Sequence, residues 1–76
     1  MLDQTKILEA IASFLGRPPQ ELRPEVELRQ LVAESFVLVE LVVELQEVFQ
    51  IQLHGRDLEG VKTVGQLIEV VQRAAG

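Results

Sequence analysis

Apolar residues recur with helical spacing in three separate stretches of this chain. In the first stretch they fall within one sector of about 120° when each residue advances 100°. These residues are Ile7, Leu8, Ile11, Phe14 and Leu15. Asp3 is suited to cap the start of a helix and Gly16 to end it, and Pro18-Pro19 prevents its continuation. The pattern predicts an amphipathic helix over residues 3–15.

The second stretch is longer and predicts a helix from about Ser35 to Gln50. One apolar stripe lies within about 80° of Leu38 and is expected to face the core. Besides Leu38, this stripe contains Leu41, Val42, Leu45, Val48 and Phe49. A further apolar stripe, Phe36, Val39 and Val43, lies on the opposite side. Three interpretations stay open for it: a binding face, a helix buried all round, or a homodimer contact.

A third helix is predicted to begin at Thr63, because Thr63 and Gln66 have the spacing of a capping box. Its inward side is expected to hold Val64, Leu67, Ile68, Val71 and Ala75. The segment around Leu58 has room for only a turn or a short helix.

Residues 16–33 form a long connection between the first two helices. Three prolines interrupt it, and its apolar residues are spaced to anchor it on a core; these are Leu22, Val26, Leu28 and Leu31. No stretch alternates as a strand would. The predicted fold class is therefore all-α: a four-helix bundle of three long helices and one short one, with a long first connection, forming one domain over residues 1–76.

Length, composition and net charge exclude several classes of function. A chain of 76 residues buries only about 60% of its unfolded surface, which leaves no room for a deep enzyme pocket. The longest apolar run, Phe36 to Val39, has four residues, far below the roughly 20 that span a bilayer. We expect no secretory signal and no membrane insertion, and hence a cytoplasmic protein. The net charge of −5 argues against nucleic acid as a partner.

Residues suited to catalysis or metal binding are sparse. The chain has no cysteine and one histidine, His54, so no metal site is expected. Glu40, Glu44 and Glu47 share one side of the second helix, where a solvated face is expected rather than an acid–base pair. We predict no catalytic residue and no enzyme activity.

Ser35 is the residue best placed for chemistry. The start of a helix presents unpaired N–H groups and the positive end of the helix dipole, which favour a phosphate. The simpler interpretation is that Ser35 only caps the helix.

The segment Leu31-Val-Ala-Glu-Ser35-Phe-Val-Leu-Val-Glu-Leu41 resembles the phosphopantetheine-attachment segment of acyl carrier proteins. The exit Phe49-Gln-Ile51-Gln-Leu53 and the turn Val61-Lys-Thr63-Val64 also resemble that family, in order, over about residues 4–74. Glu34 stands where the family usually has Asp, and Val32 where it usually has Gly. Ser-Phe followed by Leu41-Val-Val-Glu-Leu-Gln46 is similar to D-alanyl carrier proteins and other specialised stand-alone carriers.

The resemblance implies a carrier with 4'-phosphopantetheine attached covalently to Ser35 by a phosphopantetheinyl transferase. The arm's thiol would hold an acyl or aminoacyl group as a thioester, loaded by a ligase or synthase of fatty acid, polyketide or nonribosomal biosynthesis. The cargo would be sheltered among Leu41, Leu45, Val61 and Leu67. The residues expected to contact partner enzymes are Glu34, Phe36, Val39, Glu40, Val43 and Glu47.

A monomer is expected. The alternative is a non-carrier protein, an acidic helical interaction module or a dimer, in which Ser35 is only a helix cap.

Overall fold

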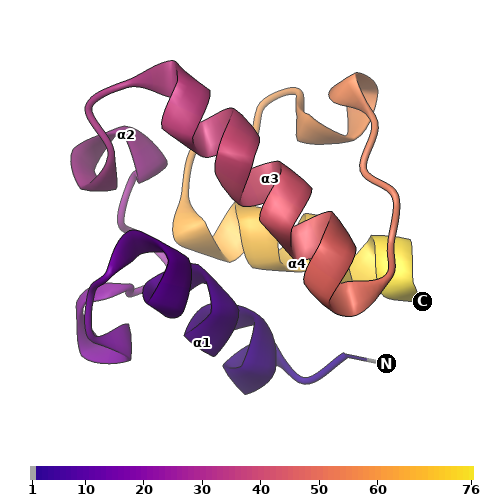
Figure 1. Ribbon diagram of the computed structural model, residues 1–76, viewed down its shortest axis with the longest axis horizontal. Coiled ribbons are helices and arrows are strands. Elements are labelled where there is room, and N and C mark those ends of the chain that lie inside the picture. The colour runs from indigo at the N-terminus through magenta and orange to yellow at the C-terminus, as the bar shows by residue number, and fades with distance from the viewer. Residues whose placement is uncertain (1) are drawn as a thin grey trace.

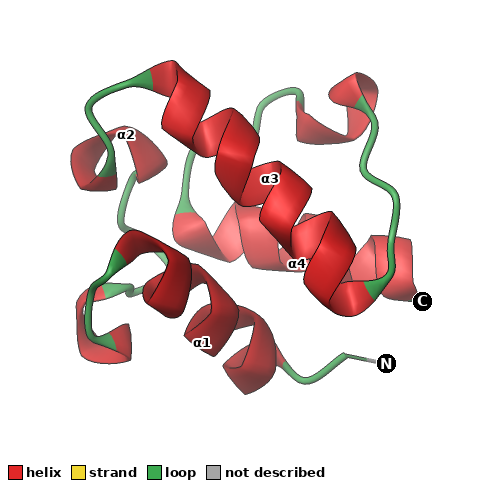
Figure 2. Ribbon diagram, in the orientation of Figure 1, coloured by secondary structure: helices red, strands yellow, loops and turns green. Residues whose placement is uncertain are grey.

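The computed structural model describes residues 2–76, and four α-helices account for most of them (Figures 1 and 2). They are α1 (Gln4–Leu15), α2 (Leu28–Leu31), α3 (Ser35–Phe49) and α4 (Val64–Ala75), with 3₁₀ turns at Pro19–Glu21 and Gly55–Leu58. Figure 1 shows α3 crossing in front of α4, with α1 below them. The predicted all-α class is confirmed.

Helix α1 has the ends that its sequence predicts. The Asp3 side chain accepts a 2.8 Å hydrogen bond from the Thr5 N–H at the first turn. Gly16 adopts a left-handed conformation with φ of 69° and closes the last turn, a conformation that costs glycine little because it lacks a Cβ. Ile7 and Ile11 are fully buried, whereas Phe14, expected on the same stripe, is partly exposed at its edge. α1 therefore packs one face against both α3 and α4.

Helix α3 provides the centre of the core. Leu41 and Leu45 are fully buried, and Leu38, Val42 and Phe49 pack around them. Val48 was expected in this stripe, and that prediction is wrong because its side chain is 50% exposed. It lies at the edge of the stripe in the last helical turn, where no neighbouring element covers it. The helix ends at Phe49, one residue before the predicted end, because Gln50 is left-handed with φ of 56°.

Helix α4 starts with the predicted capping box. The Gln66 N–H donates to Thr63 Oγ1 at 3.2 Å, and the Thr63 N–H donates to Gln66 Oε1 at 3.1 Å. The expected inward residues of its first two turns are buried, together with Val70. Ala75 is exposed, contrary to the prediction, because it lies at the end of the helix beyond the core.

The first connection is anchored as predicted but contains a helix that was not predicted. Leu22 and Leu28 are buried, and Val26 and Leu31 pack partly against the core. The short fourth α-helix is α2, within this connection, whereas the segment around Leu58 forms only a 3₁₀ turn. Gln30 Oε1 accepts a 3.1 Å hydrogen bond from the Glu27 N–H. This Glu-x-x-Gln spacing was the available signal for α2.

Candidate functional site

Ser35 is the first residue of α3, and the position before it, the N-cap, belongs to Glu34. Glu34 has extended backbone angles, and its side chain makes no capping hydrogen bond. The first backbone bond at this end runs from the Val37 N–H to the Glu34 carbonyl oxygen, at 3.1 Å. The side chain of Ser35 is exposed. The structure does not support the interpretation of Ser35 as a cap residue.

This helix end fits a phosphodiester on the serine hydroxyl. The N–H groups of Ser35 and Phe36 precede the first closed turn and have no acceptor within the helix. No side chain occupies the place of a cap, so an anion attached to Ser35 lies beside these donors and the positive end of the dipole. The hydroxyl itself is free, since none of the side-chain hydrogen bonds found within residues 2–76 includes it.

Arg17 contacts the segment that leads to Ser35, a contact that the sequence does not predict. Its guanidinium pairs with Glu21 Oε1 at 3.2 Å and approaches the Leu31 carbonyl oxygen at 3.5 Å. The Val32 N–H donates to the Leu28 carbonyl oxygen at 3.1 Å and ends α2. These contacts link the end of α1 to the end of α2. No local pattern indicates them, because Arg17 and Leu31 are distant in sequence.

The residues predicted to bind partners are all exposed. Apart from Glu34, they lie on one surface of α3, which we call the docking face after this prediction; it consists of Phe36, Val39, Glu40, Val43 and Glu47. Its apolar members are 56% (Phe36), 63% (Val39) and 46% (Val43) exposed. These values exclude a helix buried all round and leave an unpartnered apolar stripe between carboxylates.

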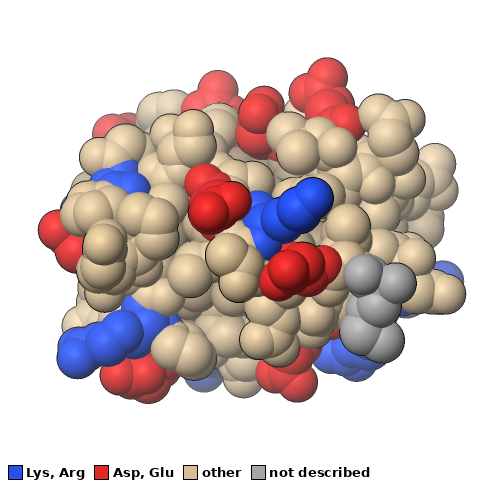
Figure 3. All heavy atoms as spheres, turned by 90° about the horizontal axis from the view of Figure 1, so that it is seen from below, with Lys and Arg blue, Asp and Glu red and all other residues tan. Residues whose placement is uncertain are grey.

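Helix α3 carries only acidic charges, whereas the surface around α1 carries both acidic and basic groups (Figure 3). Figure 3 shows this surface, where acidic and basic groups are interspersed. Helix α3 instead contains Glu40, Glu44 and Glu47 and no lysine or arginine. Exposed apolar side chains on α3 therefore lie among carboxylates and not among cations.

A cavity of about 260 Å³ opens between α2, the start of α3 and the loop before α4. Its lining consists of Glu27, Leu28, Arg29, Leu38, Val61 and Lys62. Of the four residues suggested to shelter a cargo, only Val61 lies here. Leu41, Leu45 and Leu67 are packed in the core, so that part of the suggestion is not supported. A larger hollow, about 500 Å³, lies between the Gly55–Leu58 turn and α4.

His54 does not form a metal-binding cluster with other side chains in the described part of the chain. Its backbone N–H donates to Asp57 Oδ2 at 2.9 Å, a local turn contact. In the part of the chain that the structure describes, no three His, Cys, Asp or Glu side chains gather as a metal site would require. None of the helices described is long and apolar enough to cross a membrane.

Comparison with known proteins gives consistent similarities over most of the chain. A family profile described as "Phosphopantetheine attachment site" matches residues 5–71. An acyl carrier protein of Amoebophilus asiaticus is 35% identical over 69 residues, which cover 90% of this chain and 86% of that protein. The acyl carrier protein of Rubrobacter xylanophilus is 37% identical over 67 residues, covering 87% and 83%. That of Syntrophobacter fumaroxidans is 32% identical over 71 residues, covering 92% and 88%.

Proposed function

Because this chain belongs to the acyl carrier protein family, we propose that Ser35 is the residue that bears its 4'-phosphopantetheine arm. The protein is a carrier and not a catalyst. It holds acyl groups on the covalent arm and presents them to the enzymes that act on them. The arm supplies the thiol for the thioester, which the chain lacks because it contains no cysteine.

The observation that supports Ser35 is its place as the uncapped first residue of α3. An exposed hydroxyl at that place is open to the transferase, and the phosphate that it receives meets free N–H groups. The chain has one other serine, Ser13, which lies within α1 near its end. There the backbone N–H groups are already paired within the helix, so Ser13 offers no comparable anion site.

The carrier interacts with a phosphopantetheinyl transferase and with acyl-handling enzymes, and we assign these contacts to the docking face together with Glu34. The exposed stripe supplies the apolar contact, and Glu40 and Glu47 beside it select basic partner surfaces. Two copies of this face would bring like charges together, which supports a monomer. The monomeric state and the cytoplasmic location remain predictions.

The decisive experiment is enzymatic modification followed by intact mass. The apo protein is incubated with coenzyme A and a permissive phosphopantetheinyl transferase. We expect one phosphopantetheinyl adduct on the unaltered protein and on Ser13→Ala, and none on Ser35→Ala. Circular dichroism checks that Ser35→Ala stays folded, as its exposed side chain implies. An adduct on Ser35→Ala, or no adduct with several transferases, would refute the assignment.

A further inference from the structure

The cavity beside α3 combines an apolar floor with a charged rim. Leu28 is buried at its base, and Leu38 and Val61 are partly buried against the core. The other lining residues are all charged. Such a lining suits a ligand with an apolar body and a charged end.

The rim carries one positive charge in excess. Arg29 Nε lies 2.8 Å from Glu27 Oε1, so these two side chains neutralise each other. The ion pairs found among residues 2–76 do not include Lys62. Its ammonium is therefore the uncompensated charge of the rim, in a chain whose net charge is −5.

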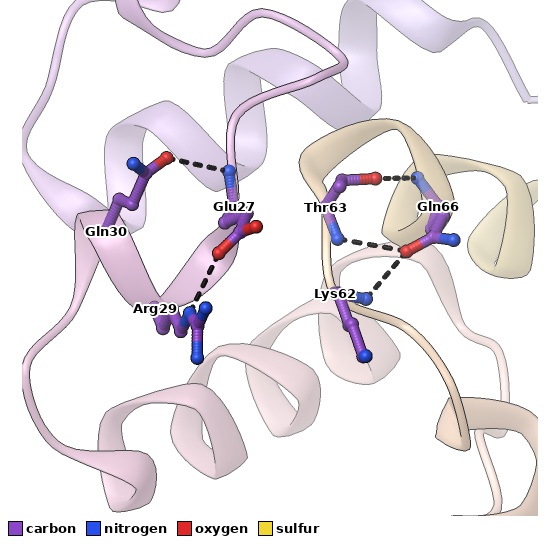
Figure 4. A network of polar contacts seen from close by, with 6 residues as sticks. All are labelled: Glu27, Arg29, Gln30, Lys62, Thr63 and Gln66. Carbon is purple, nitrogen blue, oxygen red and sulfur yellow. Dashed lines mark hydrogen bonds and ion pairs between the residues drawn. The ribbon is translucent and has the colours of Figure 1, made fainter.

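The backbone of Lys62 is held firmly, which fixes the base of this side chain. Its N–H donates to Gln66 Oε1 at 2.7 Å, and its carbonyl oxygen accepts from the Leu28 N–H at 2.8 Å. Figure 4 shows Arg29 on the segment of α2 and Lys62 on the segment before α4, with both side chains directed downward in that view. The two cations thus flank the cavity from segments far apart in the sequence.

The cavity lies close to the proposed attachment residue and is small. Leu38 follows Ser35 by three residues of α3, a rise of about 4.5 Å along the helix axis, so a flexible arm on Ser35 can fold back to it. Its volume of about 260 Å³ is below the roughly 300–1,000 Å³ of pockets for drug-sized ligands. A cavity of this size suits a short acyl group.

We propose that this cavity receives a short acyl group ending in a carboxylate, and that Lys62 pairs with that carboxylate. The inference rests on the proposed function, because the acyl group is held by the arm on Ser35. An aminoacyl group would place an ammonium beside Lys62 and is disfavoured by like charge, because Arg29 is already paired with Glu27 and leaves Lys62 as the excess charge. The positive rim thus separates the two classes of cargo that the resemblance leaves open.

The test compares three arm ends that differ in charge. Because the chain has no cysteine, the arm provides the single thiol of the holo protein. Carboxyethyl, propyl and aminoethyl methanethiosulfonates each form a disulfide with that thiol and release methanesulfinate. Intact mass confirms each form. The readouts are the thermal midpoint and the amide chemical shifts of Leu28, Leu38 and Lys62.

We expect the thermal midpoint of the carboxyethyl form to lie about 2–5 °C above that of the propyl form, and that of the aminoethyl form to be the lowest. The carboxyethyl form should also change the chemical shifts of these amides most. Lys62→Gln removes the gap between the carboxyethyl and propyl forms, and Lys62→Arg retains it. Lys6→Gln is the matched control, since Lys6 is exposed on α1 and does not line the cavity.

Equal midpoints for the three forms overturn the proposal, as does a gap that survives Lys62→Gln. If Lys62→Gln lowers all three midpoints equally, the lysine pairs with the phosphodiester common to them, which also overturns it. Failure to form the holo protein is seen by mass beforehand and contradicts the proposed function itself.

Discussion

The backbone N–H of Leu28 donates a 2.8 Å hydrogen bond to the carbonyl oxygen of Lys62, joining the start of α2 to the loop before α4. Two further backbone bonds, from Val64 to Val26 at 2.9 Å and from Gly65 to Pro24 at 3.0 Å, extend this junction. The long first connection is therefore fastened to the last helix. The junction forms one wall of the cavity and positions α2, which leads into Ser35.

Gly65→Ala tests the junction. A Cβ at this position would lie 3.1 Å from both Cβ and the carbonyl oxygen of Pro24, so the two segments must move apart. We expect a loss of about 1–3 kcal/mol in unfolding free energy, although helix propensity alone favours alanine by about 1 kcal/mol. Urea denaturation measures the difference.

Gly55→Ala is the matched control for that substitution, because a Cβ there meets nothing within 4 Å. We expect it to leave stability unchanged or slightly higher. A Gly65→Ala protein more stable than the original would show that the junction has no steric constraint.

Leu41→Ala and Val39→Ala separate stability from docking on the same helix. Leu41 is fully buried, and its truncation should cost about 2–5 kcal/mol. Val39 is 63% exposed, so its truncation should leave the thermal midpoint nearly unchanged while weakening partner binding. Thermal melts and titration with a phosphopantetheinyl transferase measure the two effects. A large loss of stability in Val39→Ala would contradict the assignment of this face.

Phe36→Ala and Glu40→Gln distinguish apolar from electrostatic docking. We expect Phe36→Ala to weaken transferase binding about tenfold at all salt concentrations, since it removes an apolar contact. Glu40→Gln should slow association, with the effect fading between about 0.05 M and 0.3 M salt. Surface plasmon resonance gives both rates. Val48 is exposed but lies outside the docking face, so the Val48→Ala variant should bind the transferase like the original protein. Weakened binding of this variant would place the interface elsewhere.

Glu34→Asp should improve the start of α3. Aspartate is a strong N-cap residue, whereas the Glu34 side chain makes no capping bond. We expect a gain of about 0.5–1 kcal/mol in unfolding free energy and undiminished modification of Ser35, measured by thermal melting and intact mass. Glu9→Asp, in the middle of α1, should instead lose a few tenths of a kcal/mol, about the difference in helix propensity. No gain in Glu34→Asp would mean that backbone geometry prevents capping.

Much of the helical framework was predictable because its signals are local. Asp3 and Gly16 at the ends of α1, and Thr63 with Gln66 at the start of α4, act through neighbours within a few residues. Errors arose where burial depends on what lies opposite. Val48 and Ala75 continue apolar helical patterns, but they extend past the elements that cover the core.

The sequence by itself determined the three long helices, the apolar stripe of Phe36, Val39 and Val43 on α3 and the serine that opens α3, because helical periodicity and capping are properties of adjacent residues. Tertiary structure alone decided that Arg17 reaches the end of α2, and that Arg29 and Lys62 share the rim of one cavity. Backbone bonds between distant segments, such as that from Leu28 to Lys62, bring Arg29 and Lys62 together, whereas Arg17 reaches Leu31 through its side chain. No local pattern encodes such contacts, since they follow from how the helices pack.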